Sequence, residues 1–194
     1  LLRKSIREKP ASKRGARQKT STPRGVTRMN LNENAYGMSD RVRQVLINDV
    51  AENYMYQDFY AVDIRQKLAA RYGLTPDHIL IGSGSSAVID MLGEVFINYG
   101  DEIVYCTPSY EAFPDMVSDN GGVRVEVPLT KDYKFDLDGM LAAITDKTKM
   151  VIVVNPNNPT GTYVPSAEVE AFVRKLPSHV LAVVDEAYCE YVDE

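Results

Sequence analysis

The sequence predicts an α/β fold, a three-layer sandwich in which helices cover both faces of a mostly parallel sheet. Two observations predict it: short apolar runs alternate with stretches of helical spacing, and several of these runs are apolar at every position. Strands that are apolar on both faces are typical of a parallel sheet buried between helices. Ligands bind such sheets at the carboxyl ends of the strands, so the residues that follow each strand are the first candidates for a site.

The orderly part of the chain begins with two helices. Ser39 and Asp40 are typical N-cap residues, and the apolar positions after them have helical spacing. A second helix is expected from about Ala61 to Tyr72, ended by Gly73. Its inward-facing residues are expected to be Ile64, Leu68 and Ala69. Further on, strands are expected at 78–81, 102–106, 123–127, 150–154 and 180–184, with helices at 85–98, 110–119, 137–144 and 166–175.

Composition excludes several classes of protein. The chain has 194 residues, of which 44% are hydrophobic and 25% charged, values that argue against a wholly disordered or collagen-like protein. No apolar run approaches the roughly 18 residues that a membrane-spanning helix needs, so no membrane partner is expected. The two cysteines, Cys106 and Cys189, form no disulfide framework. We expect reduced thiols and a cytoplasmic location.

Residues 1–28 differ from the rest of the chain. They carry ten Lys or Arg against one acid, Glu8, and almost no large apolar side chains, so we expect a basic disordered tail. A nucleic-acid arm and an organelle transit peptide are alternatives, but no aromatic residues interleave the charges and no nucleic-acid partner is expected. The chain starts at Leu1, and Met29 precedes the first orderly segment, which leaves open whether residues 1–28 are native.

A glycine- and serine-rich turn, Gly82-Ser-Gly-Ser-Ser86, follows the first expected strand and opens a helix. Glycines allow close approach of the backbone, and the N–H groups at a helix start, with two hydroxyls, suit a phosphate dianion. A tight turn with a serine N-cap explains the segment equally well. The turn also fits a dinucleotide pattern through Ala87, but the acids of the next strand, Asp101 and Glu102, lie at its beginning rather than at its end.

Three further strand ends carry unusual residues. Tyr110 follows the second strand and can stack on a flat ring, although a half-buried aromatic is the ordinary explanation. The loop Asn155-Pro-Asn-Asn-Pro-Thr-Gly161 presents the amide of Asn158 at a fixed place. Asp185 ends an apolar strand, where a carboxylate needs a cation or several donors unless it caps a helix. Together these ends call for a phosphate, a flat ring, a ring oxygen and a cationic ring nitrogen, all of which pyridoxal phosphate has.

The motifs Asn155–Gly161 and Asp185-Glu-Ala-Tyr188 carry a resemblance, together with Leu31-Asn-Glu-Asn-Ala-Tyr-Gly37. From about Asn30 to Glu194 the sequence resembles the fold-type I pyridoxal-phosphate enzymes, and within them class I/II aminotransferases of the histidinol-phosphate aminotransferase type. The sequence departs from the family pattern at Ala35 and Gln57, where Pro is usual. The resemblance implies an N-terminal arm and small-domain segment at 29–52 and a large cofactor-binding domain at 53–194 that is incomplete at its C-terminus.

The resemblance also implies roles for individual residues in a homodimer with pyridoxal 5'-phosphate as cofactor and no metal. Ser85 and Ser86 would bind the phosphate, and Tyr110 would stack on the ring. Asn158 and Tyr188 would bind the ring oxygen, and Asp185 would pair with the ring nitrogen. Tyr36 would lie near the substrate, and Tyr56, nine residues before Arg65, would reach the cofactor phosphate of the partner subunit.

One catalytic group of the family is absent from the chain. The Schiff-base lysine is expected beyond Glu194, and Lys147, Lys149 and Lys175 are not expected to replace it. We therefore expect an N-terminal fragment of a transaminase acting on an amino acid, of the histidinol-phosphate or aromatic type, and a 2-oxo acid. A catalytically inactive partial domain or partner subunit is the alternative. A decarboxylase or lyase, and an NAD-binding protein, are weaker alternatives.

Overall fold

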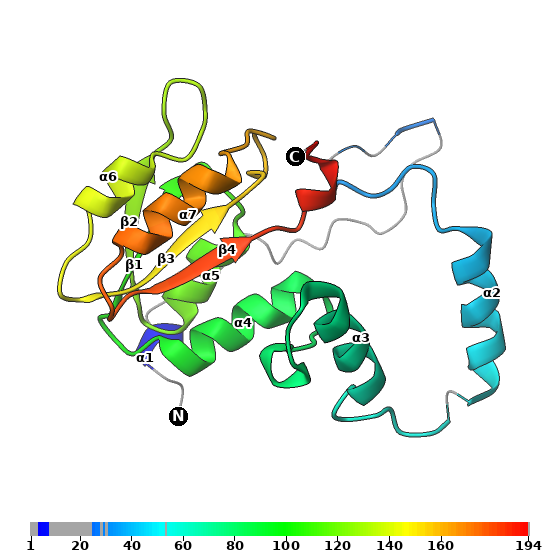
Figure 1. The fold of residues 1–194 in the computed structure, drawn as a ribbon. Helices are drawn as coiled ribbons and strands as arrows, with labels where there is room; N and C mark the ends of the chain where they lie inside the picture. Colours follow the sequence, from blue (N-terminus) through cyan, green and yellow to red (C-terminus); the bar gives the residue numbers. More distant parts are fainter. Residues whose placement is uncertain (1–3, 8–24, 28, 30, 53, 194) are drawn as a thin grey trace. The chain divides into compact units, whose positions relative to one another are not determined.

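The computed structural model describes residues 4–7, 25–27, 29, 31–52 and 54–193. They fall into two compact units, one made of Leu1–Pro10 and Gly82–Glu194 and the other of Ala11–Ile81. The tail predicted for residues 1–28 lies largely outside the described residues, and its described part contains a short helix, α1 (Lys4–Arg7) (Figure 1).

The first unit contains a four-stranded sheet in the order β2-β1-β3-β4, and all three pairings are parallel. Figure 1 shows α6 and α7 on one face of this sheet and α4 and α5 on the other, which confirms the three-layer α/β prediction. The elements are α4 (Gly84–Phe96), β1 (Glu102–Thr107), α5 (Ala112–Asp119), β2 (Val123–Pro128), α6 (Leu137–Ala142), β3 (Thr148–Val154), α7 (Ser166–Lys175), β4 (Leu181–Asp185) and the 3-10 turn η4 (Cys189–Tyr191).

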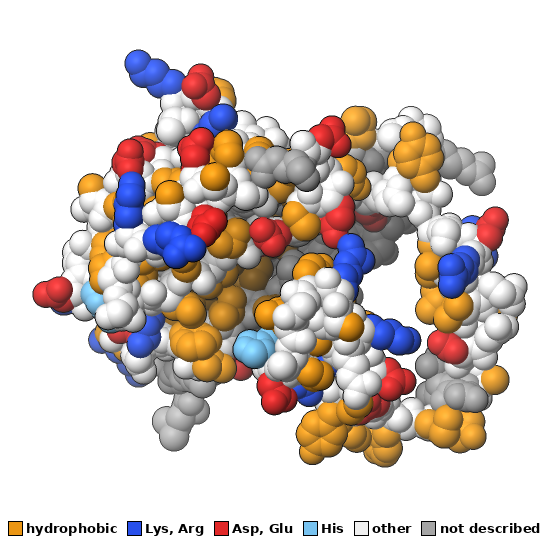
Figure 2. Space-filling view, viewed as in Figure 1, with side chains coloured by type: hydrophobic (Ala, Val, Ile, Leu, Met, Phe, Trp, Pro, Cys, Tyr) orange, Lys and Arg blue, Asp and Glu red, His pale blue; other side chains and the backbone are white. Residues whose placement is uncertain are grey.

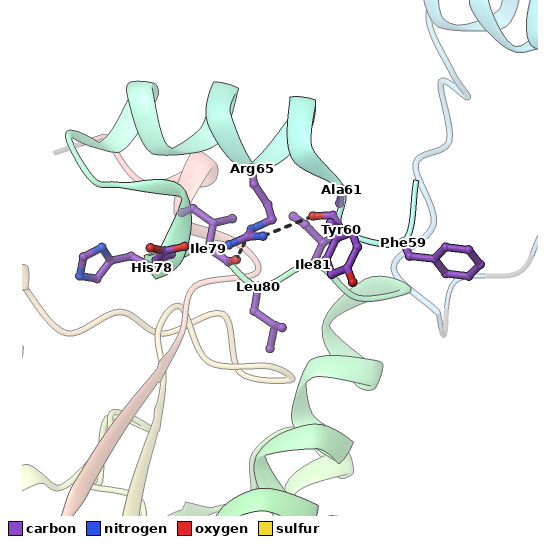
Figure 3. Close-up of a pocket in the computed structure, with 9 residues that line it drawn as sticks. Phe59, Tyr60, Ala61, Arg65, His78, Ile79, Leu80 and Ile81 are labelled. Carbon is purple, nitrogen blue, oxygen red and sulfur yellow. Dashed lines mark hydrogen bonds and ion pairs between the residues drawn. The ribbon is translucent and has the colours of Figure 1, made fainter. Parts of the chain in front are cut away.

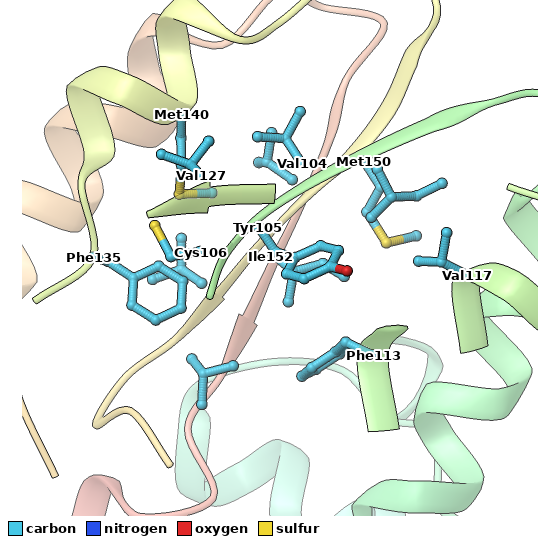
Figure 4. Close-up of a cluster of buried hydrophobic side chains, with 14 of the residues drawn as sticks. Val104, Tyr105, Cys106, Phe113, Val117, Val127, Phe135, Met140, Met150 and Ile152 are labelled. Carbon is cyan, nitrogen blue, oxygen red and sulfur yellow. The ribbon is translucent and has the colours of Figure 1, made fainter. Parts of the chain in front are cut away.

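The core of this unit surrounds the two central strands, because their side chains alternate between the two helix layers. Cys106 lies beside Phe135 and Met140 on the α6 side, whereas Tyr105 points toward Phe113 of α5 (Figure 4). Tyr105 is buried, and its hydroxyl donates to Glu126 Oε1 at 2.8 Å, so its one polar atom has a partner. Burial of a side chain such as Phe113 contributes about 1.5–3 kcal/mol to stability.

The second unit is helical, with α2 (Asp40–Asp49), η2 (Val50–Glu52), α3 (Val62–Tyr72) and η3 (Pro76–His78). The predicted start of α2 and the predicted end of α3 are both confirmed. The Ser39 hydroxyl accepts from the Val42 N–H at 3.3 Å and so caps α2. Gly73 ends α3 in the left-handed conformation, at φ 67°, which glycine adopts without steric cost.

Two expectations for this unit are wrong. Residues 78–81 form no strand: a 3-10 turn precedes Ile79, and Leu80 is 63% exposed. A strand needs a hydrogen-bonding neighbour, and no described strand pairs with this run. Ile64, expected to face inward, is 48% exposed.

Large apolar side chains are exposed on the second unit. Helix α2 has no buried residue, and orange hydrophobic surface is visible among the charged side chains of Figure 2. The exposed apolar residues of α2 and the turn after it are Val42, Val45, Leu46, Ile47 and Val50. Exposed apolar surface of this kind is typical of protein–protein contacts, ligand grooves and membrane-binding sites. Within the described residues, no helix is both long and apolar enough to cross a membrane.

Helices α4 and α5 approach each other closely at Gly93. A Cβ atom at this position would lie 2.6 Å from Met116 Cγ and 2.4 Å from Asn120 Nδ2. Met116 is buried and belongs to the core, so it has little room to move.

We therefore expect Gly93→Ala to lower stability. Crowding against Met116 costs about 1–3 kcal/mol, more than the gain of about 1 kcal/mol in helix propensity. Thermal unfolding should show a midpoint about 2–4 °C lower. Glu94→Ala, at the exposed neighbouring position, is the matched control and should change it little. An unchanged or raised midpoint for Gly93→Ala would contradict the close packing of α4 on α5.

The two cysteines are free and differ in exposure. Burial raises the pKa of Cys106 to about 11. The pKa of Cys189, which is exposed, is also raised, by desolvation and by the nearby carboxylates of Glu190 and Glu186.

A thiol reagent should therefore modify one cysteine in the native chain. The thiolate is the reactive form, so Cys189 should react slowly at neutral pH and faster as the pH rises toward its raised pKa, while Cys106 reacts only after unfolding. Counting modified thiols by absorbance and mapping them by mass spectrometry tests this. Cys189→Ser should abolish the native reaction; two reactive thiols in the folded chain would show that the core around Cys106 is open.

Candidate functional site

The predicted site residues of the first unit follow strands that end side by side. We call this place the carboxyl edge, meaning the ends of β1, β3 and β4 at Thr107, Val154 and Asp185. Because neighbouring strands lie about 4.8 Å apart, β1 and β4 are separated there by about 10 Å, a distance that one small ligand can cover.

Three hydrogen bonds connect the segments at the carboxyl edge. The Asn155 N–H donates to the Asp185 carbonyl at 2.9 Å, which joins the ends of β3 and β4. The Ser109 hydroxyl donates to Asn157 Oδ1 at 2.8 Å, which joins the turns after β1 and β3. Ser86 Oγ lies 3.4 Å from the Tyr110 hydroxyl, which connects the serine turn to the turn after β1. The structure thus brings all four predicted motifs of this unit together.

The serine turn uses only some of its polar groups within the protein. Gly84 has φ +74°, a conformation that favours glycine, and its N–H donates back to the Gly82 carbonyl at 2.9 Å. Ser83 occupies the N-cap position of α4, but its side chain makes no capping hydrogen bond, so the serine-cap interpretation fails for this residue. Ser85 and Ser86 are exposed in the first turn of α4, where unpaired backbone N–H groups favour an anion.

Tyr110 has a fixed ring. It is partly exposed and meets the buried ring of Phe113 edge-on, with the ring centroids 6.2 Å apart at an angle of 86°. This contact supports the half-buried aromatic interpretation and leaves part of the ring free for a flat ligand.

The asparagine loop contains three asparagines with different surroundings. The Asn155 side chain is buried and binds both the carbonyl and the N–H of Val164, at 2.8 and 2.9 Å. Asn157 is 2% exposed, and its amide is fully bonded within the protein. Asn158 is partly exposed, and its side chain makes no hydrogen bond to the described residues. Of the three, Asn158 is therefore the one whose amide is available to a ligand.

Asp185 has one carboxylate oxygen engaged and one available. Oδ1 accepts from the Ala187 N–H at 3.1 Å and so closes a turn, while Oδ2 has no partner among the described residues. The capping interpretation is wrong, because no helix begins at Asp185 and the N-cap of η4 is Tyr188. No Lys or Arg among the described residues forms an ion pair with this carboxylate. A partly buried carboxylate in this position favours a cationic ligand atom. Tyr188 follows it, with its ring 6.3 Å from that of Tyr191.

Two predicted site residues, Tyr36 and Tyr56, belong to the second unit, and their roles stay predictions. Both are exposed, at 99% and 91%. Tyr36 lies in a turn in which its N–H donates to Asn34 Oδ1 at 3.0 Å. Near Tyr56, the Asp58 carboxylate accepts from the N–H groups of Tyr60 and Val62 at the start of α3, and these bonds hold its pKa below the usual value.

A pocket of about 380 Å³ lies within the second unit around Arg65 (Figure 3). The guanidinium donates to the carbonyls of Pro76, Ile79 and Tyr60, and it lies 3.5 Å from Asp77. Since carbonyls and a carboxylate already surround its donors, Arg65 holds the segment before the serine turn in place and is a poor candidate for binding an anion.

The three lysines considered above lie away from the candidate site. Lys147 precedes β3 and Lys149 lies at its amino end, whereas the candidate residues follow its carboxyl end. Lys175 ends α7, a helix that starts beyond the carboxyl end of β3 and leads back to the amino end of β4. None of the three is placed to act at the carboxyl edge. The described residues also contain no cluster of His, Cys, Asp or Glu suited to a metal ion.

Comparison with known proteins identifies the family. Residues 24–194 match the family described as Aminotransferase class I and II. The chain is 37% identical over 166 residues to histidinol-phosphate aminotransferase 2 of Carboxydothermus hydrogenoformans, covering 86% of this chain and 46% of that protein. It is 40% identical over 167 residues to an aromatic amino acid aminotransferase of Rhodococcus erythropolis, covering 86% of this chain and 47% of the relative.

Solved structures agree with this match. The histidinol-phosphate aminotransferase of Sinorhizobium meliloti, solved in complex with pyridoxal-5'-phosphate, superposes with a TM-score of 0.80 at 32% identity, over 84% of this chain and 44% of that one. The chain thus spans slightly less than half the length of these relatives. On the match of residues 24–194, the chain belongs to the class I and II aminotransferase family.

Proposed function

We propose that this chain forms part of the pyridoxal-phosphate site of a transaminase. The enzyme would move an amino group between an amino acid, of the histidinol-phosphate or aromatic type, and a 2-oxo acid. Family membership and the names of the two relatives support the reaction and the substrate class. The observation that carries the proposal is the pair of available groups at adjacent strand ends, Asp185 Oδ2 and the Asn158 amide, beside the serine turn and Tyr110.

The proposed residues fit the cofactor one by one. Ser85, Ser86 and the first N–H groups of α4 would hold its phosphate. Tyr110 would stack on its ring, while Asn158 and Tyr188 would donate to its ring oxygen.

Asp185 would determine the charge of the bound ring. A carboxylate beside the ring nitrogen favours its protonated form, because opposite charges attract strongly where water is excluded. When bound, pyridoxal phosphate acts as an electron sink for negative charge at the α-carbon of an amino acid, and a protonated ring strengthens that property. Asp185 would therefore both bind the cofactor and keep a proton on it.

The proposal assigns the Schiff-base lysine to sequence beyond Glu194. Lys147, Lys149 and Lys175 do not compete for this role, because all three are remote from the carboxyl edge. The 194-residue chain would then bind the cofactor without catalysing transamination, because it lacks the amine that would accept and return the substrate proton.

We further propose a cytoplasmic homodimer in which Tyr56 reaches the cofactor phosphate of the partner subunit. The exposed Tyr56 and the exposed apolar face of α2 support a subunit contact, and the two free cysteines support the location. An inactive partner subunit is the second candidate, because the same apolar face would serve it equally well.

Cofactor binding should depend on Asp185. Pyridoxamine phosphate is a suitable probe because it has no aldehyde to react with lysines. Asp185→Asn removes a charge-assisted hydrogen bond of about 1.5–3 kcal/mol, so the dissociation constant should rise at least about tenfold. Ultrafiltration with increasing ligand measures it. Asp193→Asn, a change of the same kind at an exposed site, should leave it unchanged; equal affinities for both variants would exclude Asp185 from the site.

Extending the reading frame past Glu194 tests the transaminase proposal. The extended protein should transfer the amino group of histidinol phosphate or an aromatic amino acid to a 2-oxo acid. Borohydride reduction with pyridoxal phosphate should label one lysine outside residues 1–194, and sedimentation should give a dimer. The 194-residue chain, treated in parallel, should show neither activity nor stoichiometric labelling. A labelled lysine within 1–194, or an inactive extended protein, would reject the proposal.

A further inference from the structure

We infer that Asn157 is a positioning residue that fixes the turn carrying Tyr110 relative to the loop carrying Asn158. The inference rests on the proposed function, since it concerns the two groups that would hold the cofactor ring. It assigns a role to a buried side chain that itself would not touch the ligand.

The side chain of Asn157 connects two segments that are distant in sequence. Its Nδ2 donates to the Pro108 carbonyl at 3.2 Å, and its Oδ1 accepts from the Ser109 hydroxyl at 2.8 Å. Both partners belong to the turn after β1, 48 and 49 residues away. The backbone of Tyr110 continues directly from this turn, so the amide fixes the start of the segment that carries the ring.

The same amide is anchored in its own loop. Nδ2 donates its second hydrogen to Thr160 Oγ1 at 2.8 Å, and the Asn157 backbone binds Gly161 and Thr162 at 2.7 and 2.9 Å. Both amide hydrogens are therefore used. Aspartate has the same shape but no hydrogen to donate, and a charged carboxylate would face the Pro108 carbonyl.

Asn157 is 2% exposed, so a carboxylate at this position would be removed from water and would face the oxygen of the Pro108 carbonyl. This repulsion is costly, and the turn after β1 would move away to relieve it. Tyr110 follows Ser109 and Asn158 follows Asn157, so loss of the hydrogen bonds between Asn157 and the turn after β1 would change the distance between Tyr110 and Asn158. A misplaced positioning group weakens binding even where each contact group is intact.

Asn155 provides a matched control. It lies in the same loop, is also buried, and makes two side-chain hydrogen bonds, but both go to Val164 in the same loop rather than to the turn after β1. Asn155→Asp should destabilise the loop without uncoupling it from that turn.

Hydrogen exchange measured by mass spectrometry on the chain without ligand tests the coupling. Asn157→Asp should raise exchange about tenfold in both segments 107–113 and 155–164, and Asn155→Asp in the second only. Should Asn157→Asp fail to fold, Ser109→Ala removes one of the three hydrogen bonds and should give a smaller change in the same two segments. Exchange in 107–113 that stays at the wild-type rate, or rises equally in Asn155→Asp, would overturn the inference.

Binding of pyridoxamine phosphate links the coupling to the site. The dissociation constant should rise about tenfold in Asn157→Asp, and the circular dichroism of the bound ligand should change because the Tyr110 ring moves. Altered exchange with wild-type affinity and dichroism would refute a positioning role. If the wild-type chain binds no ligand at all, the proposed cofactor site fails, and exchange still decides whether Asn157 couples the two turns.

Discussion

Parallel pairing of β1 with β3 is the constraint on which the rest of the structure depends. Both strands are central in the sheet, and their paired residues Ile103, Val104, Met150 and Val151 are fully buried. Because the strands run in the same direction, the turns that follow them emerge at the same edge. Ser109 and Asn157 thereby become neighbours although 48 residues separate them.

Much of the fold follows from local patterns. The limits of α7 coincide with the prediction of 166–175, and Gly73 ends α3 as expected, because capping and periodicity are properties of neighbouring residues. The prediction of a strand at 78–81 is wrong because the composition of this run is that of a strand, whereas a strand also needs a partner that local composition does not specify. Ile64 shows the same limit: spacing identifies an apolar face but not what covers it.

The candidate site divides in the same way. Residues that would touch the ligand, such as Asn158 and Asp185, can be nominated from the sequence because ligands bind parallel sheets where the strands end. Asn157 lies in the same loop as Asn158 and has the same chemistry, so composition alone does not distinguish them. Only their surroundings do: one amide is buried and fully bonded, and the other is partly exposed. The two amides differ because Asn157 contacts the turn after β1, which is distant in the sequence, and such contacts cannot be predicted from local composition.

The close packing of α4 against α5 at Gly93 limits whether the serine turn could be transferred to another protein. Helix α4 begins with the serine turn, and Gly93 lies two helical turns further along, where α4 rests on Met116 of α5. An α-helix is stiff over such a length, so the packing of Gly93 against α5 fixes the orientation of the first turn of α4, which carries Ser85 and Ser86. Transplanting the turn and its helix into another scaffold would fail unless a surface equivalent to α5 accompanied them.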